Sequence, residues 1–453
     1  MSWRVLPLHL LIGLIIAANP LCAEEYGLIP VPEFEKRSFL NGMDVMFLPG
    51  EGQRVPFLLM IKNGAAFDPV GKWGVTYLTV LAIREQEMTA EGVEVETQLQ
   101  KLNVDLDFRV TWDAIHFFGT VPRENLAAGL NLLAAMIVTP QLTEEAFEGL
   151  RSRLREQVEE EGGQIQLRTQ ELFLEGLFGP NAYEHSVRGN VETLGNLYLA
   201  DLKIQYRELF KPNQAQLALY HDGDRDGAFA ALSRHWGRWV GGAPLAFTFR
   251  PAIPSQRARI HLVDWSSGAD ALTRWGVLGT ERSSQDFHVM EVFAEYLTLS
   301  LPEWADEGQI QASVEVESRQ MPGYLQLSIQ APPRQQIVYL RRLRRFLEEL
   351  GNGEVDLGRL EEAKRLTYQE FMASLEDPVS RLQTLLETGL YPVGVNFVTH
   401  YGLRLNRITP DFFRRSLQHY LSWDRSLTIL AGPIRGLEQE LQELQEFGEV
   451  HGP

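Results

Sequence analysis

The chain has 453 residues, a formal net charge of -18 and a single cysteine. That length allows two or three domains, and the 44% content of hydrophobic residues suits ordinary globular cores. A surface this acidic repels a phosphate backbone, which argues against nucleic-acid binding. One cysteine cannot form an intrachain disulfide, so burial of a core must stabilise the fold.

The N-terminus has the layout of a cleavable secretory signal. Arg4 supplies a positive start, residues 5–18 are almost wholly apolar, and Leu21-Cys22-Ala23 precedes an acidic pair. The apolar run is shorter than the ~20 residues that span a bilayer, and Leu21 is larger than the residue expected before a lipidated cysteine. We therefore predict a signal peptide at residues 1–23, no membrane span after its cleavage, and a periplasmic or secreted mature protein.

Strands and a helix are expected in the first part of the mature chain. Residues 43–48 and 56–61 are apolar runs near the turn sequence Asn41-Gly42, so they are predicted to be strands around a turn. A helix should begin near Gly74 and run past Arg84.

A strand pair and two further helices follow. Residues 106–110 and 116–121 have the pattern of paired strands, and residues 124–138 have apolar side chains at helical spacing. Thr143, followed by two glutamates, is typical of the start of another helix. We expect this helix to end at Gly162-Gly163.

An internal repeat organises the chain. A strand, a proline and a helix within residues 116–137 are matched, without a gap, by the same succession within residues 326–347. The same shift places Asp201 against Asp411. The sequence therefore predicts an α+β fold of two homologous α/β repeats, each a mixed or antiparallel sheet covered by helices. The expected ranges are residues 24–242 for the first repeat, 257–453 for the second, and 243–256 for a proline-containing linker.

A series of short motifs covers nearly all of the mature chain. The first repeat contains Asn63-Gly64-Ala65-Ala66-Phe67-Asp68-Pro69, Gly71-Lys72-Trp73-Gly74, Asn181-Ala182-Tyr183, Arg188-Gly189-Asn190 and Lys211-Pro212-Asn213-Gln214-Ala215. The second contains Leu360-Glu361-Glu362-Ala363-Lys364 and Ile408-Thr409-Pro410-Asp411. In this order and spacing, the motifs resemble those of pitrilysin/insulinase-type zinc peptidases, and the two-repeat length is similar to their processing-peptidase-like branch.

The resemblance implies a metal site whose ligands are missing here. Members that cleave peptides carry His-x-x-Glu-His on the first helix, where both histidines bind Zn²⁺ and the glutamate is the general base. In this chain Tyr77, Val80 and Leu81 stand at the first histidine, the base and the second histidine. Because valine and leucine can neither bind a metal nor carry a proton, we expect no zinc, no other cofactor and no catalytic residue at these positions. The third ligand, a glutamate, aligns somewhere from Glu156 to Glu161, and the sequence does not show which glutamate it is.

No other histidine offers a clear metal site. His288 and Glu291 form His-x-x-Glu in the second repeat, but Val292 follows where a second histidine would be needed. The remaining candidates have no partner at ligand spacing: His116, His185 and His221. We interpret these histidines as surface or packing residues.

The grip on substrate implied by the resemblance is also missing. Active relatives hold the peptide backbone with an arginine and a tyrosine of the second repeat. Residues 301–316, which correspond to that stretch, contain neither at the expected places. Arg319 and Tyr324 lie nearby but outside the pattern.

Three functions remain open at this point. The resemblance and the lost ligands favour an exported, proteolytically inactive homologue that acts as the non-catalytic partner of an active zinc peptidase, as a heterodimer around a peptide substrate. The alternatives are a stand-alone peptide-binding or scaffold protein, and an active metallopeptidase with an unrecognised site. An adjacent gene encoding a His-x-x-Glu-His homologue would favour the first over the second.

Overall fold

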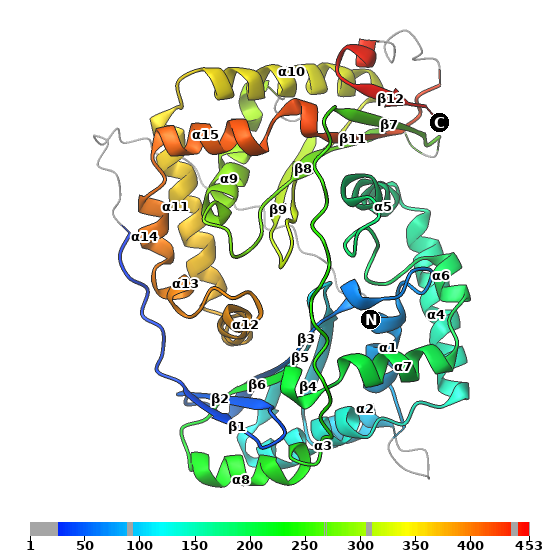
Figure 1. The fold of residues 1–453 in the computed structure, drawn as a ribbon, viewed down its shortest axis with the longest axis vertical. Coiled ribbons are helices and arrows are strands. Elements are labelled where there is room, and N and C mark those ends of the chain that lie inside the picture. The colour runs from blue at the N-terminus through cyan, green and yellow to red at the C-terminus, as the bar shows by residue number, and fades with distance from the viewer. Residues whose placement is uncertain are drawn as a thin grey trace.

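Two six-stranded sheets covered by helices form the two halves of the molecule (Figure 1). The computed structural model describes residues 26–87, 94–266, 268, 270–304, 310–435 and 443–452. The N-terminal sheet has the order β1 (Glu35–Ser38), β2 (Asp44–Leu48), β6 (Ala215–Tyr220), β3 (Arg54–Lys62), β5 (Ala114–Pro122) and β4 (Asp105–Val110). The C-terminal sheet has the order β12 (Glu449–His451), β7 (Arg259–Asp264), β11 (Leu427–Gly432), β8 (Ala271–Leu278), β10 (Tyr324–Ala331) and β9 (Gln311–Glu317).

Helices cover the faces of both sheets. Those of the N-terminal half are α1 (Val75–Arg84), α2 (Val95–Lys101), α3 (Leu126–Val138), α4 (Glu144–Gly162), α5 (Ile165–Phe178), α6 (Val191–Gly195), α7 (Leu199–Leu209) and α8 (Arg225–Trp236). Those of the C-terminal half are α9 (Phe287–Trp304), α10 (Pro333–Asn352), α11 (Leu357–Ser374), α12 (Pro378–Leu390), α13 (Asn396–Thr399), α14 (Tyr401–Asn406) and α15 (Pro410–Tyr420). Among the helices of the described ranges, none is both long and apolar enough to cross a membrane.

The two sheets repeat one topology. The run β2-β6-β3-β5-β4 corresponds to β7-β11-β8-β10-β9, and in each sheet the first of these pairs is parallel while the other three are antiparallel. The predicted fold class, two α/β repeats with mixed sheets, is therefore confirmed. Residues 240–258 form neither helix nor strand and run from α8 to β7 (Figure 1). The proposed signal peptide lies outside the described residues, and the repeat boundaries stay a prediction.

One helix from each half packs on the sheet of the other half. Helix α5 packs on β8 and β11 of the C-terminal sheet, while α12 packs on β3 and β6 of the N-terminal sheet. Phe173 of α5 is fully buried, and its ring reaches the backbone at Gly276 so closely that a Cβ there would lie 2.6 Å from it. In the reverse direction, Leu382 and Leu386 of α12 pack against Leu58 of β3. The halves are thus interlocked and not only tethered by a linker.

The first expected strand pair needs correction. Asn41-Gly42 connects β1 to β2, and β1 was not expected because Glu-Lys-Arg-Ser carries no apolar alternation. Strands β2 and β3 both form, but β6 lies between them and pairs with each. A central apolar strand needs a neighbour on both sides, and the hydrophobic pattern does not say which strand that neighbour is. Helix α1 ends at Arg84 and does not continue beyond it.

Candidate functional site

The motif residues before α1 fix the start of that helix. The carboxylate of Asp68 accepts hydrogen bonds from the backbone N–H groups of Gly74 (2.7 Å) and Thr76 (3.1 Å), which have no partner within the helix. Gly74 has a φ of +90°, and a side chain there would meet the carbonyl oxygen of Arg188 at 2.5 Å. Glycine is therefore required where the helix start touches the loop before α6.

The three positions of the missing motif have different surroundings. Val80 is fully buried in the core of the N-terminal half. Leu81 is half-buried in the cluster formed with α4 and α7. Tyr77 is half-buried between Phe108 and Arg188. Its ring centroid lies 5.6 Å from that of Phe108 and 5.7 Å from the guanidinium carbon of Arg188. That these positions bind no zinc stays a prediction. Their side chains do not form a set of donors that fits the metal.

Arg188 links Tyr77 to helix α4. Its Nη1 donates to both carboxylate oxygens of Glu161, at 2.6 and 2.5 Å, and its Nη2 donates to the side chain of Gln157 at 3.3 Å. One ion pair, Arg153 with Glu85, joins α4 to the end of α1. The two helices therefore run past each other with Tyr77 at the Glu161 end.

One carboxylate of the candidate run differs from the others in its surroundings. Glu161 is half-buried and faces the Tyr77 position through Arg188. The other carboxylates of the run are exposed: Glu156, Glu159 and Glu160. A fixed guanidinium thus lies beside the one half-buried carboxylate among these four. Arg188 belongs to a recognised motif, but its partner is 27 positions earlier, so no local pattern could have revealed the pair.

A cavity of about 400 Å³ adjoins this pair at the boundary between the halves. Its lining comes from the end of β4, from α4 and α5, from the loop before α6, and from the turn after β9. The charged members of the lining are Arg109, Glu161, Glu171, Arg188, Glu317 and Arg319, and the apolar ones include Trp112, Val158, Leu167, Leu174 and Val187. Both halves therefore contribute to one partly open, chemically mixed space.

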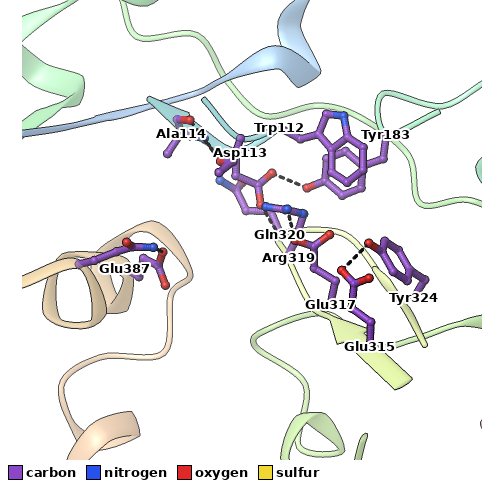
Figure 2. A network of polar contacts seen from close by, with 12 residues as sticks. Trp112, Asp113, Ala114, Tyr183, Glu315, Glu317, Arg319, Gln320, Tyr324 and Glu387 are labelled. Atoms are coloured by element: carbon purple, nitrogen blue, oxygen red, sulfur yellow. Dashed lines mark hydrogen bonds and ion pairs between the residues drawn. The ribbon is translucent and has the colours of Figure 1, made fainter. Parts of the chain in front are cut away.

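A buried polar network, drawn in Figure 2, includes three residues that line the cavity: Trp112, Glu317 and Arg319. Asp113, which has no exposed surface, accepts a hydrogen bond from the hydroxyl of Tyr183 and another from the backbone N–H of Gln320 at 3.0 Å. Arg319 forms an ion pair with Glu317, and its guanidinium carbon lies 4.9 Å from the ring centroid of Trp112. The hairpin tip of one repeat is thereby fixed to a turn of the other.

Burial sets the protonation behaviour of this network. Burial raises the pKa of the Asp113 and Glu317 carboxyls. Burial alone lowers the pKa of Arg319, but the charges of Glu317 and the other acidic groups around it outweigh this and raise it overall. Tyr324 donates to Glu315 at 3.0 Å and is itself buried. Arg319 and Tyr324, which lie outside the expected pattern, are therefore parts of a buried interdomain contact.

Comparison with solved structures identifies this architecture. A protease from Helicobacter pylori superposes with a TM-score of 0.80 at 16% identity, over 88% of this chain and 100% of that one. A peptidase M16 inactive domain from Pseudomonas fluorescens gives 0.78 at 17%, over 88% and 98%. The chain has the fold of M16 peptidases. The fold implied by the pitrilysin/insulinase resemblance is thus confirmed. The periplasmic protease PqqL from Escherichia coli gives 0.75 at 12%, with 93% of this chain covering 51% of that one. No protein-family model and no curated protein matches the sequence.

The His-x-x-Glu pair of the second M16-like repeat is a packing cluster. His288 is 3% exposed and lies against the rings of Phe397 (5.3 Å) and Tyr401 (4.7 Å). Its Nδ1 is 3.4 Å from Glu291, which also accepts a hydrogen bond from Tyr401. Burial lowers the pKa of His288. Within the described part of the chain, no group of three or more His, Cys, Asp or Glu side chains is arranged to hold a metal.

Two other histidines make the fold sensitive to acid. Burial lowers the pKa of His116 and that of His185 to about 4, from an ordinary value of 6.5. The unfolded chain therefore takes up these protons first, so the stability they contribute is complete above pH 6.5 and is lost as the pH falls towards 4. We expect His116→Leu to reduce the loss of unfolding free energy between pH 7 and pH 5 by about 2 kcal/mol in urea titrations. The exposed His235, changed to leucine, is the control; an equal effect there would refute the assignment to His116.

Proposed function

We propose that this chain is an exported, proteolytically inactive homologue of M16 peptidases that serves as the non-catalytic partner subunit of an active zinc peptidase. One observation carries the proposal: the guanidinium of Arg188 is paired with Glu161 over the ring of Tyr77. The guanidinium of Arg188 therefore occupies the part of the fold where the resemblance implies a metal ion.

The chemistry of these residues argues against metal-assisted hydrolysis. Catalytic zinc needs three side chains with lone pairs, usually from histidine and a carboxylate. Arg188 engages the half-buried carboxylate of Glu161, and its positive charge opposes the binding of a dication at such short range. Val80 supplies no group that could take a proton from water. By contrast, the motif residues that form the start of α1 and its contact with the loop before α6 are present.

Two structurally similar proteins support the proposed inactivity and export. The Pseudomonas fluorescens domain is described as inactive, and PqqL as a periplasmic protease. Because this chain spans about half of PqqL, we propose that a second chain supplies what the other half of such a protein contains. We also propose the division into a signal peptide at 1–23, repeats at 24–242 and 257–453, and a linker at 243–256.

Affinity purification of the tagged chain from the periplasm tests the partnership. We expect a homologue carrying His-x-x-Glu-His to co-purify in a one-to-one ratio, and its activity on unfolded peptides to rise when the chain is added. Recovery of the chain alone, with peptide bound to it but no homologue, would favour the stand-alone binding protein. Recovery with neither partner nor peptide would contradict both functions.

Restoring the lost ligands tests the role of Arg188. The triple variant Tyr77→His, Val80→Glu and Leu81→His should still bind no stoichiometric zinc, because Arg188 keeps Glu161 engaged. Adding Arg188→Ala should release Glu161 and allow about one zinc per chain, measured by elemental analysis after dialysis. Arg188→Ala alone is the control and should bind none. Full zinc binding by the triple variant would show that Arg188 does not block the site.

A further inference from the structure

Two histidines meet at the edge of the C-terminal sheet. His261 lies on β7 and His451 on β12, and they are direct partners in the parallel ladder between these strands (Figure 1). Because side chains alternate between the two faces of a sheet, partners in a ladder point to the same face. The two residues are far apart in the sequence, so no local motif contains both.

The distance between the two rings suits a shared metal ion. The ring centroids of His261 and His451 lie 4.9 Å apart, and the ring planes are tilted by 57°, so the rings do not stack. Imidazole nitrogen binds Zn²⁺ and similar ions at about 2.0–2.1 Å, so two imidazoles on one ion have centroids about 4.5–5.2 Å apart. The observed separation falls within this range.

Both rings can be reached from the solvent. His451 is exposed, and His261 is half-buried with ring nitrogens that remain accessible. Neither ring has a hydrogen bond to another described residue. Burial and the neighbouring charges of His451 and Arg259 lower the pKa of His261. Its imidazole is therefore neutral at pH 7, which is the form that binds a metal.

The charged neighbours limit the site to two protein ligands. Arg259 and Glu449 are partners one step along the same ladder and face the same side as the histidines. The carboxylate of Glu449 is 3.1 Å from the guanidinium of Arg257, with which it forms an ion pair. Glu449 is thus engaged elsewhere, and the positive charges of the two arginines oppose a dication. The affinity must come from the two imidazoles.

We propose that His261 and His451 bind one divalent transition-metal ion, with water molecules in its remaining coordination positions. Imidazole suits Cu²⁺, Ni²⁺ and Zn²⁺, and the affinity of such a site rises from Ni²⁺ to Cu²⁺ and is lower again for Zn²⁺. Cu²⁺ is therefore the ion that binds most tightly. The metal would join β12, a strand of three residues, to β7 in addition to their ladder.

This pair is separate from the positions at which the resemblance implies zinc. Two imidazoles are fewer than the three or four protein ligands that hold zinc in catalytic and structural sites. Dialysis should therefore remove zinc from the pair. The inference does not rest on the proposed function, and it adds no stoichiometric zinc to the dialysed chain.

Calorimetric titration of the mature chain, without an affinity tag, with copper(II) chloride tests the site. We expect one Cu²⁺ to bind at this pair, Ni²⁺ to bind more weakly, and Mg²⁺, which prefers oxygen ligands, not to bind there. The electron paramagnetic resonance spectrum of the copper-loaded chain should show two coordinated nitrogens. The absence of Cu²⁺ binding, or a spectrum without nitrogen ligands, would overturn the inference.

Variants of the two histidines assign the binding to this pair. His451→Gln, at an exposed position, should weaken Cu²⁺ binding by at least about tenfold, because a single imidazole remains. His261→Gln should have a similar effect for the same reason. His235→Gln, exposed on α8, is the matched control and should change nothing. If His451→Gln binds Cu²⁺ as tightly as the unmodified chain, or if His235→Gln loses as much, the metal site is refuted.

Discussion

Replacing Arg319 with alanine should lower the free energy of unfolding by about 3–5 kcal/mol, because it leaves the half-buried Glu317 and the buried Asp113 without the cation between the two halves. The Arg319 side chain is only 14% exposed, so solvent cannot replace it. Chemical denaturation followed by circular dichroism at pH 7 measures the loss.

The matched control is an arginine in an ordinary surface pair. Arg414→Ala removes an ion pair with Asp411 on α15, whose two side chains are 39% and 76% exposed. It should cost no more than about 0.5 kcal/mol. If Arg319→Ala costs as little as Arg414→Ala, the buried network does not hold the halves together.

Replacing Phe173 with alanine should cost about 3–5 kcal/mol, through lost burial and the cavity left behind. Its ring belongs to α5 of the first repeat but packs against Tyr324, 5.7 Å away between centroids, and against Gly276 of the second. Because both halves share this side chain, we expect them to unfold together, with hydrogen exchange accelerated in both sheets.

An exposed apolar residue provides the comparison for Phe173. Ile253→Ala, at a side chain 87% exposed between the halves, should change the free energy of unfolding by less than about 0.5 kcal/mol. Faster exchange confined to the N-terminal half in the Phe173→Ala variant would show that α5 does not couple the two sheets.

The repeated architecture could be predicted because its signal is local. A strand, a proline and a helix recur at a constant shift, and the hydrophobic pattern within each element reports its type and its buried face. The same local information does not specify which sheet that face covers. Helices α5 and α12 are the examples, since each packs on the sheet of the other repeat.

The candidate site also has features that the sequence predicts and features that depend on tertiary contacts. The loss of ligands at Tyr77, Val80 and Leu81 is a prediction from the sequence, made because the surrounding motifs resemble those of zinc peptidases. The pairing of Arg188 with Glu161 and the burial of Asp113 could not be predicted, since both depend on contacts between distant segments. Aspartate is rarely buried, so a surface position is the natural expectation for Asp113 until its tertiary partners are known.

The most direct test of the inactive-partner proposal is an assay of the purified mature chain, free of any partner, on unfolded peptides with and without a metal chelator. The absence of a histidine pair and a base predicts no cleavage above the background in either condition, and no stoichiometric zinc in the same preparation. Cleavage that a chelator abolishes, together with about one zinc per chain, would contradict the account.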